Sequence, residues 1–172
     1  YFDESSYQMV CCYRKHFFAP EEWKDQTVIV TFEGIAHEAQ VFLNGERIGE
    51  HHCGYTAFSI DISKKLRIGA ENVLTVRVDS RENLNIPPFG YVIDYMTYGG
   101  IYREVYVDVK NENYLADIFL HSDIEKSKIQ KNGEQIADTK LISEINVFSS
   151  GKTNRLKDLF IRQSIRERGT EN

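Results

Sequence analysis

The chain has 172 residues, of which 41% are hydrophobic and 12% aromatic, enough to build one complete domain and part of a second. Its 26 acidic and 21 basic residues give a formal net charge of −5, so it lacks the basic surface that binds nucleic-acid phosphates. No apolar run approaches the roughly 18 residues that span a bilayer. We therefore expect a folded protein with neither nucleic acid nor a membrane as partner.

Short β-prone segments follow one another through the first 110 residues, separated by turn signals and without a long helical pattern. The expected strands are residues 9–18, 28–32, 38–43, 55–60, 72–79 and 101–109. Asn44-Gly45 follows the third of them and predicts a hairpin, because both residues readily adopt the positive φ of a tight turn. This succession predicts an all-β fold, an antiparallel β-sandwich of jelly-roll type.

The composition changes near residue 110, where a polar stretch separates two apolar runs. We expect one domain over residues 1–110 and a second over residues 111–172. Three further strands are expected in the second, at residues 114–121, 139–148 and 159–165. They predict the opening part of another β-sandwich. The chain starts with Tyr1 and not with Met, which indicates a piece of a longer protein.

The stretch before the last strand of the first domain has the most distinctive chemistry. Residues 87–100 combine two prolines and a Gly-Gly pair with Tyr91, Asp94, Tyr95 and Tyr98, which predicts a long ordered loop. Aromatic rings pack against the C–H faces of sugars, and a carboxylate accepts hydrogen bonds from two neighbouring hydroxyls. The same residues would also suit an aromatic packing cluster in which Asp94 caps a turn.

Several motifs occur together and in a fixed order. They are Phe-Glu-Gly-Ile at residues 32–35, Ala-Gln-Val-Phe-Leu-Asn-Gly at 39–45, Gly-Tyr-Thr-Ala-Phe at 54–58, Glu-Asn-Val-Leu at 71–74 and Tyr-Gly-Gly-Ile-Tyr-Arg at 98–103. With these motifs the chain resembles the N-terminal sugar-binding domain of glycoside hydrolase family 2. That family includes β-galactosidases, β-glucuronidases and β-mannosidases, and the form of the motifs is most similar to β-galactosidase-like members.

The resemblance implies a galactose-binding-like jelly roll followed by a partial immunoglobulin-like β-sandwich. In the family a catalytic (β/α)8 barrel comes next and contains the two catalytic glutamates. We therefore expect no catalytic residue in this chain and no hydrolysis by it alone. The barrel of the same protein and a carbohydrate substrate are the implied partners, and a homo-oligomer is left open.

The resemblance assigns Asp94 to the sugar site. It implies that this aspartate hydrogen-bonds hydroxyls of the terminal sugar, with Tyr95 and Tyr91 as walls of the pocket. Some β-galactosidases also place a sodium ion at this aspartate. We expect no cofactor and no metal in this chain, and leave a sodium or magnesium ion to the full-length enzyme.

The function implied is that of an exo-glycosidase that hydrolyses terminal β-D-galactosides. β-Glucuronidase or β-mannosidase activity, a free-standing carbohydrate-binding module and a two-sandwich interaction protein are the alternatives. Cys11, Cys12 and Cys53 form no Cys-x-x-Cys pair, which favours a reducing, cytoplasmic location. His51 and Cys53 have no third ligand near them in the sequence, so we expect them to pack at a strand end.

Overall fold

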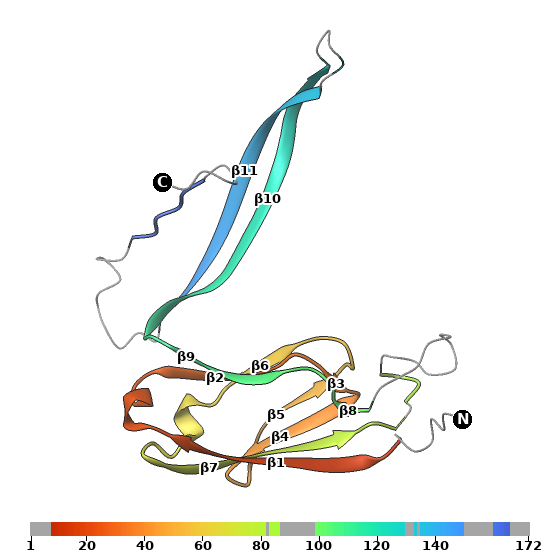
Figure 1. The fold of residues 1–172 in the computed structure, drawn as a ribbon, viewed down its shortest axis with the longest axis vertical. Helices are drawn as coiled ribbons and strands as arrows, with labels where there is room; N and C mark the ends of the chain where they lie inside the picture. Colours follow the sequence, from red (N-terminus) through yellow and green to blue (C-terminus); the bar gives the residue numbers. More distant parts are fainter. Residues whose placement is uncertain are drawn as a thin grey trace. The chain divides into compact units, whose positions relative to one another are not determined.

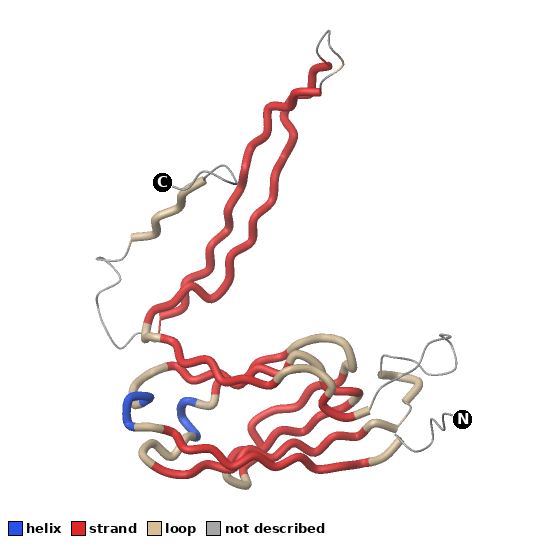
Figure 2. The backbone as a smooth tube through the Cα atoms, viewed as in Figure 1, coloured by secondary structure: helices blue, strands red, loops and turns tan. Residues whose placement is uncertain are grey.

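The computed structural model describes residues 8–81, 83–86, 99–129, 133, 135–149 and 160–165. The chain forms two compact units, Tyr1–Asn111 and Glu112–Asn172. In the described part the regular structure is almost entirely strand, and the helical segments are single 3-10 turns, η2 (Glu21–Trp23) and η3 (Ser63–Lys65) (Figure 2). Every described strand pair is antiparallel, so the predicted all-β antiparallel fold is confirmed.

The first unit is a sandwich of two main sheets with a two-stranded ribbon beside them (Figure 1). The larger sheet has the order β1-β7-β4-β5, the smaller has β6-β2-β9, and β3 pairs with β8. The strands are β1 (Val10–Ala19), β2 (Thr27–Phe32), β3 (Ile35–Ala36), β4 (Glu38–Leu43), β5 (Glu46–His52), β6 (Phe58–Asp61), β7 (Ala70–Asp79), β8 (Gly100–Ile101) and β9 (Val105–Lys110).

The core lies between the two main sheets. Alternate residues of a strand point to the same face, so each strand places every second side chain in the interior. Buried residues of β2, β4 and β7 form one hydrophobic cluster, in which the following are at most 3% exposed: Val28, Val30, Phe32, Val41, Leu43, Val76 and Val78. Burying a side chain of this size stabilises the fold by about 1.5–3 kcal/mol relative to leaving it in water.

The Asn44-Gly45 turn joins β4 to β5 as predicted. Asn44 has a φ of 53° and Gly45 a φ of 89°, the positive values that the tight turn requires. The Asn44 side chain adds contacts that the turn motif does not require. Its Oδ1 accepts a hydrogen bond from the Val73 N–H at 3.0 Å, and its Nδ2 donates to Oδ1 of the fully buried Asn72 at 2.9 Å. The turn is thereby fastened to the neighbouring strand β7.

The strand expected at residues 101–109 is interrupted, and the two-residue strand β3 was not predicted. Between β8 and β9 the chain leaves the ladder, and the Tyr102 hydroxyl donates to the Gly54 carbonyl at 2.5 Å. Gly34 makes room for this ring, because a Cβ at Gly34 would lie 2.9 Å from Tyr102 Cζ. The alternating pattern continues through the break and so conceals it in the sequence.

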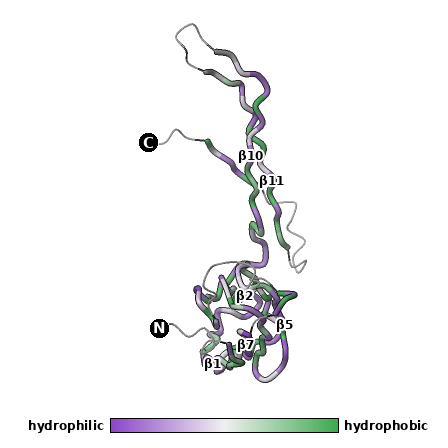
Figure 3. The backbone as a smooth tube through the Cα atoms, turned by 90° about the vertical axis from the view of Figure 1, so that its right-hand side faces the viewer, coloured by the Kyte–Doolittle hydropathy of each residue, from purple (hydrophilic) through white to green (hydrophobic). Residues whose placement is uncertain are grey.

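The second unit contains one long hairpin in its described part. β10 (Asn113–Ile129) pairs with β11 (Gln135–Ser149), and the register shifts twice along their length. The strands expected at residues 114–121 and 139–148 lie within them. Figure 3 shows hydrophobic and hydrophilic residues interspersed along both strands. The Tyr114 and Phe148 rings contact each other across the pair in a tilted arrangement, with their centroids 5.0 Å apart.

The strand expected at residues 159–165 is not formed in its described part, residues 160–165, so that prediction was wrong. A strand needs a backbone partner, whereas here the contact to the hairpin is made by a side chain. Gln163 Nε2 donates to the Ser143 Oγ at 2.9 Å. Phe160 and Ile165 remain 88% and 82% exposed, so no apolar burial compensates for the missing ladder.

Candidate functional site at the base of the loop after β7

The three residues assigned to the sugar site, Asp94, Tyr95 and Tyr91, lie outside the described residues. Both ends of the connection that contains them are described, at residues 81 and 83–86 on one side and at 99–100 on the other. We call this connection loop 81–99. The structure therefore shows what surrounds the base of the loop, and a polar pocket is found there.

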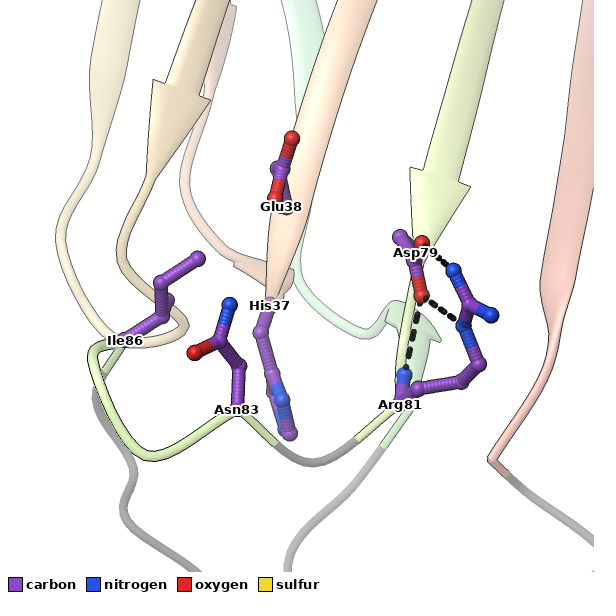
Figure 4. Close-up of a pocket in the computed structure, with 6 residues that line it drawn as sticks. All are labelled: His37, Glu38, Asp79, Arg81, Asn83 and Ile86. Carbon is purple, nitrogen blue, oxygen red and sulfur yellow. Dashed lines mark hydrogen bonds and ion pairs between the residues drawn. The ribbon is translucent and has the colours of Figure 1, made fainter.

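The pairing of β4 with β7 creates this pocket. Glu38 and Asp79 lie directly opposite each other in the antiparallel register, at the start of β4 and the end of β7. The His37 N–H donates to the Asp79 carbonyl at 3.1 Å, and the His37 side chain is 2% exposed. The resulting loop-base pocket has a volume of about 220 Å³ and is lined by His37, Glu38, Asp79, Arg81, Asn83 and Ile86 (Figure 4).

Arg81 holds the Asp79 carboxylate on one side of the pocket. Its Nε donates to Oδ1 at 2.9 Å and its Nη2 to Oδ2 at 2.6 Å, while the Arg81 backbone N–H also reaches Oδ1 at 3.2 Å. These hydrogen bonds from Arg81 lower the pKa of Asp79 below its usual range, with a further contribution from the charge of Arg77, 3.8 Å away. Asp79 is therefore ionised at neutral pH.

Asn83 and Ile86 form the opposite side. The Ile86 N–H donates to the Asn83 carbonyl at 3.2 Å, and Asn83 Oδ1 accepts from the Asn85 N–H at 2.9 Å, which gives the chain a tight turn. Ile86 is 9% exposed, so it anchors this turn to the sandwich. In Figure 4 the Asn83 side chain stands between Ile86 and His37.

Buried Ser80 links the two ends of loop 81–99. Its Oγ donates to the Ala36 carbonyl at 2.8 Å and accepts from the Gly100 N–H at 2.9 Å. Gly100 has a φ of 83°, and a Cβ there would collide with the hydroxyl of Tyr13. Glycine is thus required for the loop to return so close to β1.

The loop-base pocket contains the kinds of groups that hydrogen-bond hydroxyls. Its two carboxylates accept hydrogen bonds, the Arg81 guanidinium and the Asn83 amide donate, and Ile86 offers an apolar contact. Sequence reasoning missed all six lining residues, because they converge only through the pairing of β4 with β7. The start of β4 and the end of β7, each polar at the rim of an apolar strand, were the available signal.

The His51–Cys53 stretch packs at a strand end, as expected. His51 stacks on Phe58 with ring centroids 4.3 Å apart, and its Nε2 lies 2.8 Å from the Thr56 Oγ1. Burial lowers the pKa of His51.

Within the described residues no group of three or more His, Cys, Asp or Glu side chains could hold a metal ion. The described residues also contain no helix with the length and apolarity that a bilayer-spanning segment requires.

Relatives of known activity match much of the chain. A beta-galactosidase of Thermoanaerobacter pseudethanolicus is 39% identical over 153 residues, which is 84% of this chain and 21% of that protein. A beta-galactosidase of Thermoanaerobacterium thermosulfurigenes is 46% identical over 119 residues, 69% and 17% of the two chains. A beta-glucuronidase of Bacteroides fragilis is 36% identical over 106 residues, which is 62% of this chain and 15% of that protein. The chain thus spans about a fifth or less of the length of these curated relatives.

Solved structures share the fold. A Bifidobacterium dentium beta-glucuronidase complexed with coumarin-3-O-glucuronide aligns with a TM-score of 0.70 at 22% identity, covering 83% of this chain and 27% of that one. An uncultured Clostridium beta-glucuronidase aligns with a TM-score of 0.63 at 28% identity, covering 83% and 25%. The model of the glycosyl hydrolases family 2 sugar binding domain matches residues 3–110. Since that match covers more than half of the residues, the chain belongs to glycosyl hydrolase family 2, as its motifs predicted.

Proposed function

We propose that the protein to which this chain belongs is a retaining exo-glycosidase that releases terminal β-D-galactose, and that its first domain supplies one wall of the sugar pocket. Family membership supports the reaction class. The two relatives named beta-galactosidase, which match 84% and 69% of the chain, support galactose as the sugar. The relative named beta-glucuronidase makes a glucuronide the second candidate.

The charge of the loop-base pocket is the observation that favours galactose. Glu38 and Asp79 contribute two carboxylates, whereas Arg81 is the one guanidinium that lines the pocket and is already bound to Asp79. A glucuronide would bring a third carboxylate towards this negative wall and be repelled by it. Galactose is neutral, and its neighbouring hydroxyls can donate to carboxylate oxygens.

The proposed mechanism divides the work between two domains. In the retaining reaction one glutamate attacks the anomeric carbon while the other protonates the departing oxygen, and the second then activates the water that releases the sugar. We assign both glutamates to a barrel of the same protein. The first domain would orient the sugar, with Asp94 accepting from its hydroxyls and Tyr95 and Tyr91 as walls. This chain alone would then hydrolyse nothing.

The proposed mechanism uses no metal ion. A sodium or magnesium ion in the full-length enzyme remains a proposal. The three cysteines are free thiols, which supports a reducing cytoplasmic location for the protein.

A panel of nitrophenyl glycosides tests the proposal on the full-length protein. We expect kcat/KM to be highest for the β-galactoside and to exceed that for the β-glucuronide by at least about tenfold, the discrimination that a charge repulsion of about 1.4 kcal/mol gives. Preference for the glucuronide would overturn the choice of sugar while leaving the reaction class intact. Activity on none of the three would overturn the reaction class.

Replacing Asp94 tests the role of the loop. Asp94→Asn should lower kcat/KM by roughly 10²-fold, because it removes a charge-assisted hydrogen bond that strengthens in the transition state. Asp108→Asn is the matched control, since Asp108 lies on β9 and contacts Lys110 at 3.3 Å. Equal kinetics for the two variants would reduce Asp94 to a structural role.

A titration separates the enzyme from a free-standing sugar-binding module. We expect the 172-residue chain to show no saturable galactose binding at millimolar concentrations, because only one wall of the proposed pocket is present. Saturation of chemical-shift changes in that range would favour the module.

A further inference from the structure

We propose that Ser80 is a positioning residue whose single hydroxyl joins both ends of loop 81–99 to the β3–β4 connection and so sets the geometry of the loop-base pocket. The inference rests on the proposed function, because the role of that pocket in sugar binding is itself proposed. The geometry of the hydroxyl does not depend on which sugar is bound.

The two hydrogen bonds of Ser80 have fixed directions. The Ala36 carbonyl can only accept, so it takes the one hydroxyl proton, at 2.8 Å. The Gly100 N–H can only donate, so it uses an oxygen lone pair, at 2.9 Å. Ser80 is 4% exposed and Ala36 3%, and water therefore cannot replace either bond without a rearrangement.

Ser80 is also held from the β1 side. Its backbone N–H donates to the Met9 carbonyl at 2.9 Å, just before β1 begins. The residue thus fixes three segments that are far apart in the sequence: the start of β1, the β3–β4 connection and the return of the loop at Gly100. Among the described residues between β7 and β8, Ser80 alone hydrogen-bonds all three segments.

These partners adjoin the walls of the loop-base pocket. Asp79 and Arg81 flank Ser80 in the chain, and Ala36 precedes His37, so three of the six lining residues are covalent neighbours of the Ser80 hydrogen-bonded pair. A shift at Ser80 therefore moves the Asp79–Arg81 wall relative to His37. Displacements of about 1 Å in a substrate-positioning group can cost roughly 10²-fold in rate.

The other end of the loop depends on the same hydroxyl. Gly100 starts β8 and pairs with Ala36, so the Ser80 hydroxyl completes a small closed set of bonds among residues 36, 80 and 100. Without it, the Gly100 N–H and the Ala36 carbonyl lose this partner inside the protein. We expect the loop ends to separate locally before the sandwich unfolds.

The experiment compares Ser80→Ala with Ser63→Ala in the full-length protein. Ser63 is a matched control, because its Oγ also accepts from one backbone N–H, that of Val28 at 2.8 Å, and donates to one acceptor, the Asp61 carboxylate. It lies at η3, and its two partners, Val28 and Asp61, belong to β2 and β6 of the smaller sheet. Ser80→Cys is nearly isosteric and replaces Ser80→Ala if the alanine variant does not fold.

Two readouts are taken together at a temperature well below the melting transition. Kinetics use whichever nitrophenyl glycoside the wild type cleaves fastest, and hydrogen exchange is followed at the Gly100 amide. We expect Ser80→Ala to lower kcat/KM about tenfold and to accelerate exchange at Gly100, while Ser63→Ala changes neither more than about twofold. Ser80→Ala should lower Tm more than Ser63→Ala does, because Ser80 is 4% exposed and Ser63 is half-buried, so both readouts are taken where both variants are fully folded.

Each deviating result has a defined meaning. Faster exchange with wild-type kinetics would make Ser80 merely structural and overturn the inference. Unchanged exchange at Gly100 would overturn it as well, whatever the kinetics. A wild type that cleaves no glycoside would by itself refute the proposed function. It would also refute the positioning role, because the pocket would then have no catalytic geometry to set. The exchange result would still report on the hydrogen bonds of Ser80.

Discussion

The two units of the chain use similar strand patterns but differ in what their side chains bury. In the first unit Phe32 and Val78 are fully buried between two sheets. In the hairpin of the second, Ile118, Phe119 and Ile124 are 50%, 55% and 69% exposed. The alternation of apolar and polar residues decides which face of a strand is apolar. That face stabilises the fold only when a second layer of structure covers it.

The difference also concerns polar groups. Asn72 of the first unit is fully buried with hydrogen bonds to Asn44, to the backbone of Arg67 and to the Ala70 carbonyl. In the described part of the hairpin, the side-chain Oδ1 of Asn113 and Nδ1 of His121 are buried without a hydrogen-bond partner. Both polar atoms of the Asn72 side chain thus have partners, whereas these two atoms of the hairpin have none.

Hydrogen exchange on the 172-residue chain would test the contrast most directly. We expect amides of β4 and β7 to exchange roughly 10⁴-fold more slowly than those of β10 and β11. Folded single domains are stable by about 5–15 kcal/mol, whereas an isolated two-stranded hairpin is marginal. Comparable protection of the amides in both units would show that contacts other than the strand pairing described above stabilise the hairpin.

A matched pair of truncations sharpens the comparison at one side chain each. Phe32→Ala should lower the free energy of unfolding of the first unit by about 3–5 kcal/mol, because it leaves a cavity in the core. Phe18→Ala removes the same atoms from a position of the first unit that is 61% exposed and should change it by less than about 0.5 kcal/mol. Urea unfolding followed by the fluorescence of Trp23, the chain's single tryptophan, measures the first unit alone. Equal midpoints would contradict the burial argument.

The buried amide of Asn72 gives the next largest effect. Asn72→Ala should cost about 1–3 kcal/mol, since the Arg67 N–H and carbonyl lose their partner inside the protein. Asn44→Gly keeps the positive φ of the turn and removes only the side-chain bonds, so we expect a loss of about 1 kcal/mol or less. The same urea titration measures both. A larger loss from Asn44→Gly would make the turn, and not the buried amide, the main stabilising feature.

The smallest expected effect is the pH dependence of the Asp79–Arg81 pair. Folding lowers the pKa of Asp79, so the pair stabilises the first unit above the unfolded pKa of about 3.9 and this contribution disappears as pH falls through the lower folded value. The urea midpoint of the wild type should exceed that of Asp79→Asn at pH 6, and the difference should shrink as the pH falls below the unfolded pKa of about 3.9. A difference that stays constant with pH would show that the carboxylate charge contributes nothing.

Local signals in the sequence predicted most of the first unit. Short alternating segments placed β4 and β7, and Asn44-Gly45 placed the hairpin, because these features depend on neighbouring residues only. The break between β8 and β9 was missed, since it depends on the approach of Tyr102 to Gly34 across the fold. The strand expected at residues 159–165 had suitable composition but no backbone partner.

The candidate site was harder to predict, because its parts are distant in the sequence. The motifs indicated the family and singled out Asp94, a role that remains a prediction. Glu38 and Asp79 stood out only as polar residues at the ends of two apolar strands, and they meet His37 only through the antiparallel register of β4 and β7. Ser80 is an ordinary serine in the sequence, and its importance follows only from the bonds that it makes to Ala36 and Gly100.

The connection from β7 to β8 starts in the four-stranded sheet and ends in the ribbon with β3. Because the ladders are complete on both sides of it, insertions, deletions or wholesale exchange of the intervening residues need not disturb any strand pairing. Under the proposed function, substitutions confined to this connection would alter contacts to the sugar while leaving the β-sandwich unchanged.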